Sequence, residues 1–139
     1  MTTPTRPAQQ PTELSRPFWE AASRGQLVLQ CCSACGTIRH YPRLLCDRCY
    51  SDAAHWVPAS GNGTVHSWTV AHYAYHPSFA SELPYVMVTV DLAEGVRALG
   101  RWRGAPALAL GLPVHGRFEP REGGVDLVFE PMPGPVRAA

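Results

Sequence analysis

Four cysteines form the clearest chemical motif in the sequence. Cys32 and Cys35 make one Cys-x-x-Cys pair, and Cys46 and Cys49 make a second pair after ten intervening residues. Each turn of this kind can direct two thiolates at one ion, so two turns supply the four ligands of a tetrahedral Zn²⁺. Four thiolates leave no open coordination position, which predicts a structural zinc ion and not a catalytic one.

Other interpretations of these cysteines are weaker. Redox chemistry by a Cys-x-x-Cys pair is typical of a βαβ setting, and the surrounding residues show no such pattern. Gly36 follows the first Cys-x-x-Cys pair, at a position where such a turn often needs a residue with positive φ. Tyr50 occupies the equivalent position after the second pair, which is less favourable. We interpret the fifth cysteine, Cys31, as a spectator on a strand; a reactive thiol or an alternative ligand are the other options.

Histidines and arginines are the remaining candidates for chemistry. We find no carboxylate or hydroxyl at nucleophile spacing to any of the six histidines, so we interpret them as surface or strand-face residues. Arg97, Arg101 and Arg103 share one parity of a predicted strand. Together they could hold a pyrophosphate or an acidic partner surface. Alternatively, they form a solvated strand face that discourages edge pairing.

Aromatic side chains are dense around the cysteines. Phe18 and Trp19 precede them, and Tyr41 and Trp56 lie among and after them. A lobe of this size cannot bury so many large rings by itself. They therefore either pack onto the next domain or form an exposed anchor patch for a partner.

The elements that must position these residues are mostly short strands. After residue 58, apolar and polar residues alternate with period two, which is typical of half-buried strands. We predict five strands, near residues 63–74, 84–92, 96–103, 113–119 and 125–131. Five short strands with little helix favour a small closed barrel of the OB type, with an open sandwich as the alternative.

The N-terminal segment differs from the rest. Residues 1–12 are polar and proline-rich and predict a disordered arm. Ser15 as N-cap, Pro17 in the first turn and Gly25 beyond the end predict a short helix. The predicted fold class is mainly β, with an N-terminal arm and helix (1–30), a rubredoxin-like zinc ribbon (31–58) and an OB-fold barrel (59–139).

Composition excludes several functions. All twelve basic residues are arginine, so Schiff-base and P-loop lysine chemistry is excluded. A net charge of +1 without a dense basic run argues against strong nucleic-acid binding. We see no secretory signal and no membrane span, and clustered thiols suit a reducing compartment, so we expect a cytoplasmic protein without membrane contact.

Several short segments together resemble a known family, the bacterial and archaeal zinc-ribbon plus OB-fold proteins long catalogued as a domain of unknown function. The resemblance runs from Phe18 to about Pro131. Besides the two cysteine pairs, it rests on Leu29-Gln30, Pro42, Gly61-x-Gly63-Thr64-Val65-x-Ser67-Trp68, Pro84-Tyr85-Val86, Val90-Asp91-Leu92-x-Glu94-Gly95 and Gly111-x-Pro113-Val114.

This resemblance implies an accessory subunit that has no catalytic residues of its own. Such proteins accompany a thiolase-like enzyme, an aldolase or an enoyl-CoA hydratase, and are thought to assist assembly and to shape the acyl-CoA channel. Only the four zinc ligands carry over residue by residue. The sequence departs from the family at Tyr50, where glycine is common, and at Cys31, where arginine is common.

We therefore expect a non-catalytic subunit of an acyl-CoA-processing complex. Its candidate ligand- or partner-binding residues are Phe18, Trp19, Arg97, Arg101 and Arg103. The alternative is a single-stranded nucleic-acid-binding protein, because OB folds and zinc ribbons both serve that role. A stand-alone enzyme ranks lowest, because no catalytic constellation is visible.

Overall fold

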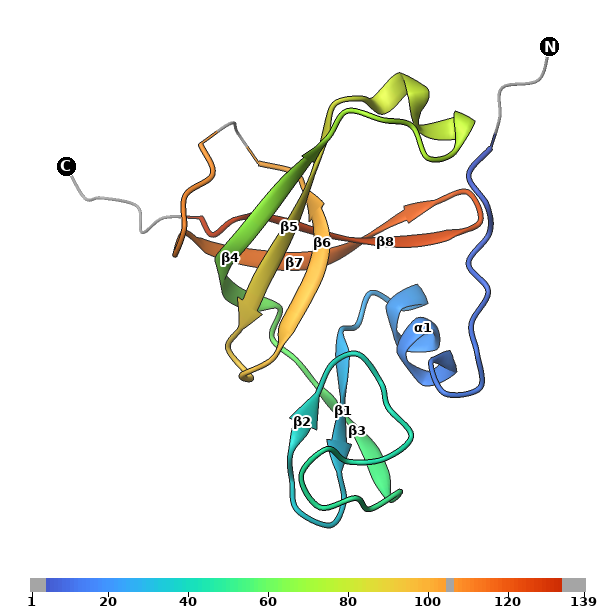
Figure 1. Cartoon of the computed structure of the whole chain (residues 1–139), viewed down its shortest axis with the longest axis vertical. Coiled ribbons are helices and arrows are strands. Elements are labelled where there is room, and N and C mark those ends of the chain that lie inside the picture. The colour runs from blue at the N-terminus through green and yellow to red at the C-terminus, as the bar shows by residue number, and fades with distance from the viewer. Residues whose placement is uncertain (1–4, 105–106, 134–139) are drawn as a thin grey trace.

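A small three-stranded ribbon joins a closed five-stranded barrel in the computed structural model (Figure 1). The structure describes residues 5–104 and 107–133. The parts of the predicted arm and barrel that lie outside the described residues are 1–4, 105–106 and 134–139. The order of helix, ribbon and barrel confirms the mainly β fold class. The predicted division at residues 30/31 and 58/59 stays a prediction, and the ribbon sheet begins slightly earlier, at Val28.

The N-terminal helix α1 (Arg16–Ser23) forms where the sequence predicts it. Ser15 takes the N-cap position but makes no side-chain cap bond; its Oγ instead accepts from the amide of Thr12 at 3.0 Å. Gly25 ends the helix with φ of 76°, in the left-handed region that suits glycine. The helix buries Phe18, Ala21 and Ala22. None of the helices in the described part of the chain has the length and apolar character needed to span a bilayer.

The ribbon is an antiparallel sheet with its first strand in the middle. β1 (Val28–Cys32) pairs with β2 (Ile38–Arg39) on one side and β3 (Ala54–Pro58) on the other. Leu29 is fully buried, and the neighbouring buried Gln30 accepts from Arg39 Nε at 2.7 Å and from the Arg43 amide at 2.8 Å. One glutamine side chain therefore ties β2 and the loop after it to the central strand.

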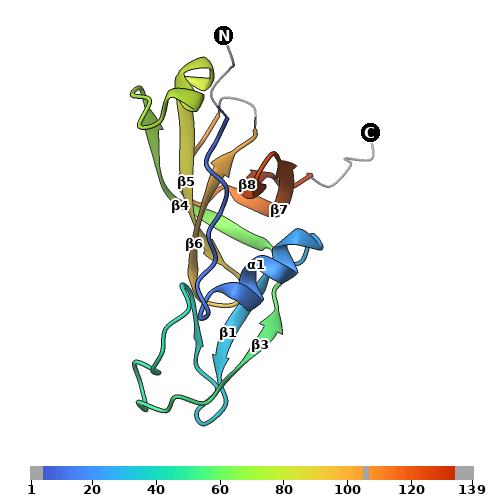
Figure 2. The ribbon, with the colours of Figure 1, turned by 90° about the vertical axis from the view of Figure 1, so that its right-hand side faces the viewer.

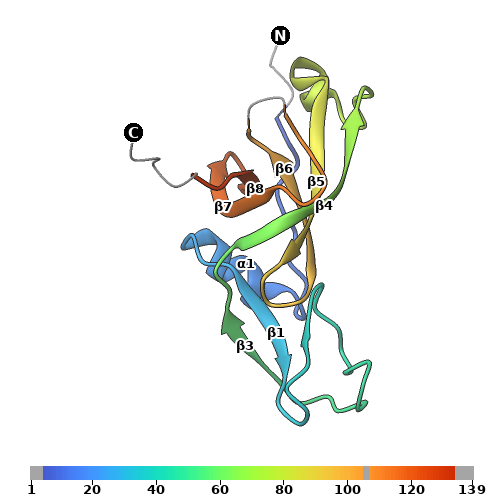
Figure 3. The same cartoon turned by 90° about the vertical axis from the view of Figure 1, so that its left-hand side faces the viewer.

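The barrel closes in the order β4-β5-β6-β8-β7, which confirms the OB type over the open sandwich. Only the β6–β8 pair is parallel; the other pairs are antiparallel. A 3₁₀-helix, η1 (Pro77–Glu82), separates the first two barrel strands. Figure 3 shows β4 carrying the chain from the ribbon into the barrel. The strands are β4 (Asn62–Ala71), β5 (Tyr85–Leu92), β6 (Arg97–Trp102), β7 (Pro113–Arg121) and β8 (Gly124–Pro131).

The barrel core is filled by aliphatic side chains around one large ring. Phe129 is fully buried, and an added Cβ at either Gly100 or Gly116 would lie 2.6 Å from its ring. These two glycines therefore make room for the ring. Trp102 is 8% exposed and belongs to the same core cluster, so the strand parity predicted for β6 is correct.

The N-terminal arm corrects one expectation. Residues 5–12, predicted to be disordered, lie against the barrel and run down to α1 (Figure 2). Gln9 donates its amide to the Gly123 carbonyl at 3.1 Å, and Arg6 contacts Glu82 through two hydrogen bonds of 2.6 and 2.7 Å. The disorder prediction is wrong for this part of the arm. Its composition is polar and proline-rich, and composition alone does not reveal hydrogen-bond partners that are distant in sequence.

Candidate metal centre and neighbouring cavity

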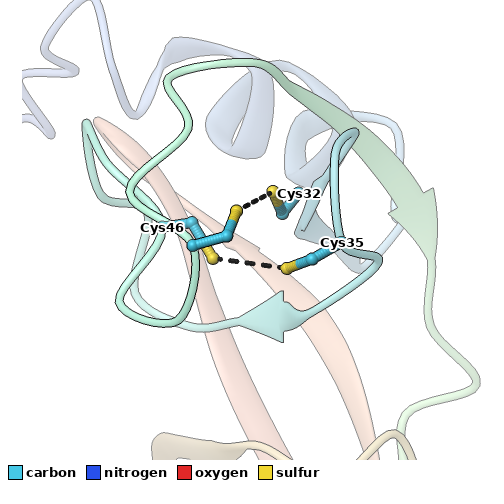
Figure 4. A group of neighbouring side chains, drawn as sticks. Cys32, Cys35 and Cys46 are labelled. Carbon is cyan, nitrogen blue, oxygen red and sulfur yellow. Dashed lines mark hydrogen bonds between the residues drawn. The ribbon is translucent and has the colours of Figure 1, made fainter.

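The four predicted zinc ligands lie together at the tip of the ribbon. Their sulfur atoms lie within 4.8 Å of one another, with Cys32 and Cys49 at 3.5 Å and Cys35 and Cys46 at 3.6 Å. Figure 4 shows the side chains of Cys32, Cys35 and Cys46 gathered at this site. Zn–S bonds of about 2.3 Å place the sulfurs of a tetrahedral site about 3.8 Å apart. The spacing of the four sulfurs therefore fits one Zn²⁺.

Two similar turns place these sulfurs. The Gly36 amide donates to the Cys32 carbonyl at 2.9 Å, and the Tyr50 amide donates to the Cys46 carbonyl at 3.0 Å. Gly36 has φ of 78° and Tyr50 has φ of 63°. The second turn thus has the geometry of the first although its residue carries a side chain, and Tyr50 bears the strain that glycine avoids.

Backbone amides prepare the cluster for a cation. A hydrogen bond from the Cys35 amide lowers the pKa of the Cys32 thiol, and one from the Cys49 amide lowers the pKa of Cys46, in both cases against burial. The Ser51 amide also lowers the pKa of Cys49, but neighbouring Cys32, burial and the other two thiols together raise it to about 12. The thiol of Cys49 therefore keeps its proton because the other sulfurs lie close to it. A divalent cation at the site would favour the loss of this proton.

The quartet can hold a metal but offers it no reactive position. Cys32 and Cys46 are buried, whereas Cys35 and Cys49 reach the surface. Among the residues that the structure describes, no other group of three or more metal-ligating side chains occurs. Cys31 lies outside the quartet and directs its thiol to the Gly36 carbonyl at 3.6 Å.

Arg97, Arg101 and Arg103 lie on the outer side of the barrel as predicted, but they do not form one exposed surface, because Arg101 is covered. Arg97 is exposed and donates to Asp91 at 2.8 Å. The side chain of Arg101 is only 7% exposed, contacts Glu82 at 2.9 Å and lies over the Tyr85 ring at 4.6 Å. The reason is η1, which precedes β5 and brings a carboxylate onto the outer face of the barrel.

Arg103 directly follows β6 and is partly exposed. It contacts Glu119 on β7 at 3.0 Å. Because this ion pair is partly solvated, it contributes little to stability. Arg97 and Arg103 therefore keep surface that a partner could use, whereas Arg101 does not.

Phe18 and Trp19 pack onto the molecule itself. Phe18 is 7% exposed; its ring centroid lies 6.0 Å from that of Phe118 on β7 and 5.4 Å from that of His40. Trp19 stands edge-on to Phe18 at 5.0 Å and is partly buried. Of the two predicted alternatives, packing onto the barrel is the one that the structure favours for Phe18. Tyr41, in the ribbon loop, is 56% exposed.

Two histidines contact serine hydroxyls, although the sequence showed no such spacing. His55 Nδ1 lies 2.9 Å from Ser33 Oγ, on the surface of the ribbon. His76 Nδ1 lies 2.8 Å from Ser78 Oγ and also accepts from the Ser78 amide, so it caps η1. Neither pair lines the cavity of about 430 Å³ described next, and the second has a local structural role.

Sequence reasoning missed a cavity of about 430 Å³ between α1, the loop after β2 and the outer face of the barrel. Its walls include Phe18, Trp19, Tyr41, Tyr85, Leu99 and Arg101. Segments from all parts of the chain meet there, so no local motif indicates it. The available signal was the outward-facing apolar residues Met87, Leu99 and Leu127 on three barrel strands.

A four-cysteine ribbon followed by a closed OB barrel defines the class of zinc-ribbon plus OB-fold proteins. The family model of the ChsH2 rubredoxin-like zinc ribbon domain matches residues 19–54, and that of the ChsH2 C-terminal OB-fold domain matches residues 56–119. The chain belongs to this ChsH2-type zinc-ribbon and OB-fold family.

Known relatives carry this module in several settings. The chain is 45% identical over 100 residues to a probable enoyl-CoA hydratase alpha subunit of Thermomonospora curvata, covering 70% of this chain and 31% of the relative. It is 32% identical over 71 residues to a DUF35 domain-containing scaffold protein of Methanocaldococcus jannaschii, covering 50% of each. The chain thus spans about a third to a half of the length of these curated relatives.

One solved structure covers nearly the whole fold. It is described as an Ltp2-ChsH2(DUF35) aldolase, and the matched chain is 39% identical with a TM-score of 0.79. The match covers 91% of this chain and 98% of that one.

Removal of one buried ligand should unfold the ribbon. Purified protein should carry about one zinc ion per chain. Cys46→Ser should lose the metal and the ribbon structure together, because metal binding and local folding are one equilibrium. Elemental analysis and hydrogen exchange measure both effects. Cys31→Ser is the matched control and should keep the metal; full zinc occupancy in Cys46→Ser would refute the assignment.

One substitution in each turn should change the zinc affinity, and the two changes should have opposite signs. Gly36→Ala should lower zinc affinity by about fivefold, since alanine at positive φ costs about 1 kcal/mol. No atom lies within 4 Å of the added Cβ, so backbone strain is the sole cause. Tyr50→Gly should raise the affinity slightly, because the 76% exposed side chain loses little packing. Chelator competition measures both; weaker binding by Tyr50→Gly would show that the ring itself stabilises the turn.

His40 should make stability depend on pH. Its Nδ1 is buried without a hydrogen-bond partner among the described residues, and burial lowers its pKa to about 4. The unfolded chain, with the ordinary value of 6.5, binds a proton first, so stability falls as the pH falls below 6.5. The loss should reach about 2 kcal/mol at pH 5 relative to pH 7. In urea titrations His40→Gln should flatten this dependence, whereas the exposed His72→Gln should leave it unchanged; an equal slope in all three proteins would contradict the argument.

Proposed function

We propose that this chain is a non-catalytic accessory subunit of an acyl-CoA-processing complex, with a thiolase-like, aldolase or hydratase partner. One observation carries the proposal: the chain matches 98% of a chain from the solved Ltp2-ChsH2(DUF35) aldolase at 39% identity. The similarity therefore extends over a whole module and is not limited to its zinc motif. The scaffold description of the Methanocaldococcus jannaschii relative supports the same role.

The hydratase relative supports an accessory role through its length. This chain corresponds to 31% of that subunit, so the hydratase activity of the whole subunit need not reside in the shared part. The chemistry of the described residues points in the same direction. The four-thiolate site has no open position for a substrate, and the cavity of about 430 Å³ has neither Ser33–His55 nor His76–Ser78 in its lining.

Arg97 and Arg103 are the candidate contacts that suit a partner or the phosphates of CoA. Their side chains are 61% and 34% exposed, and their present partners are surface carboxylates. Such pairs contribute little in water, so each guanidinium can exchange its carboxylate for another oxyanion at small cost. Trp19, which is partly buried on α1, is the candidate apolar contact.

The nucleic-acid alternative loses support. OB folds bind oligonucleotides on the face of their second and third strands, here β5 and β6. In this chain that face is partly covered by α1, the arm and the ribbon loop, which enclose Met87, Leu99 and Arg101. A net charge of +1 gives little attraction for phosphates. A cytoplasmic location belongs to the proposal, since thiolate ligands persist in a reducing compartment.

Co-expression tests the proposed function. The chain and a thiolase-like, aldolase or hydratase candidate from the same genome should elute as one complex in size-exclusion chromatography with light scattering. Acyl-CoA turnover should require the partner. Cys46→Ser should fail to form the complex, and Cys31→Ser should form it normally. Steady turnover by the pure chain, abolished by a point mutation in it, would show that the chain is itself the enzyme.

A further inference from the structure

The cavity beneath the N-terminal arm has the size and lining of a small-molecule site. Its volume of about 430 Å³ lies within the range of about 300–1,000 Å³ that ligand pockets span. Aromatic rings from separate segments of the chain contribute to its wall: Phe18 and Trp19, Tyr41, Phe79 and Tyr85, and Phe118. Leu99 contributes from the barrel and is 47% exposed, so the cavity opens to solvent.

One wall of this cavity is polar and is centred on Arg101. The guanidinium is more than nine-tenths buried, with one terminal nitrogen on Glu82 at 2.9 Å and its plane over the Tyr85 ring. Its Nε is buried and has no hydrogen-bond partner among the described residues. A buried donor on a cation that lacks a partner costs free energy, and an acceptor oxygen from a ligand would relieve that cost.

The charges around Arg101 leave an excess of one positive charge. Glu82 and Asp126 each contact Arg6, and Asp126 also contacts Arg121 at 2.8 Å. With Arg101, three guanidinium groups share two carboxylates. His40, which also lines the cavity, is neutral at pH 7 because burial lowers its pKa to about 4. A single anion would balance the cluster.

We propose that this cavity binds an amphipathic organic carboxylate, with its apolar body among the aromatic rings and its carboxylate oxygen at Arg101. The arm forms the outer wall, since Arg6 and Gln9 line the cavity and hold the arm to η1 and to the β7–β8 hairpin. The site belongs to this chain alone and does not depend on the partner proposed above. Its test and the test of the complex can therefore fail separately.

Decanoate is a suitable probe, with decanol as the matched neutral molecule. Isothermal titration calorimetry on the full zinc-loaded chain should show saturable binding of one decanoate. Decanol should bind at least tenfold more weakly, because it cannot balance the positive charge. Arg101→Met keeps the length of the side chain and should weaken decanoate binding at least tenfold. Arg24→Met removes the same charge at an exposed position that does not line the cavity and should leave the affinity unchanged.

A second variant keeps the proposal testable if Arg101→Met does not fold. Leu99→Trp adds bulk at the mouth of the cavity from an exposed position and should abolish decanoate binding without lowering the melting temperature. Three results would overturn the proposal: no saturable binding by the parent, decanol binding as tight as decanoate, or parent-like binding by Leu99→Trp.

Discussion

Crowding of four cysteine sulfurs is the constraint on which the ribbon depends, because four thiolates at this spacing would repel one another. The four sulfurs lie within 4.8 Å, and backbone amides lower the pKa of Cys32 and Cys46 while the fourth sulfur, on Cys49, keeps its proton. A lobe this small cannot bury enough apolar surface to offset both this repulsion and its chain entropy. A divalent cation would reverse the sign of this electrostatic energy, so we expect folding of the ribbon to require the metal.

The consequences of a folded ribbon extend beyond the metal. The loop from His40 to Pro42 follows β2, and it forms one wall of the cavity against Phe18. Gln30 and Arg39 connect that loop to the central strand through buried hydrogen bonds. Loss of the metal would therefore loosen a wall of the cavity, although the ligand cysteines themselves do not line it.

Local patterns predicted much of this structure. The cysteine spacing gave the metal site, and alternation placed Val88, Val90 and Trp102 in the barrel core, because both signals depend on residues close in sequence. The burial of Arg101 and the docking of the arm were not predictable in that way. They depend on Glu82, which is 76 residues away from Arg6 in the sequence. Glu82 also belongs to a 3₁₀-helix that the sequence analysis did not predict. Parity gave the correct side of the strand for Arg101 but could not reveal what covers it.

The closure of this face also explains why arginine, and not lysine, suits these positions. Arg6 contacts two carboxylates and the Phe79 ring, and Arg101 contacts Glu82 and the Tyr85 ring. A planar guanidinium can bond oxygens at its edge while its face lies on a ring, which an ammonium group cannot do. The arm, η1 and the barrel are thereby fixed together, and the part of the outer face of β5 and β6 around Arg101 is covered by the chain itself. A protein partner must then bind the surfaces that remain exposed, which separates this barrel from OB folds that bind a nucleic-acid strand on that face.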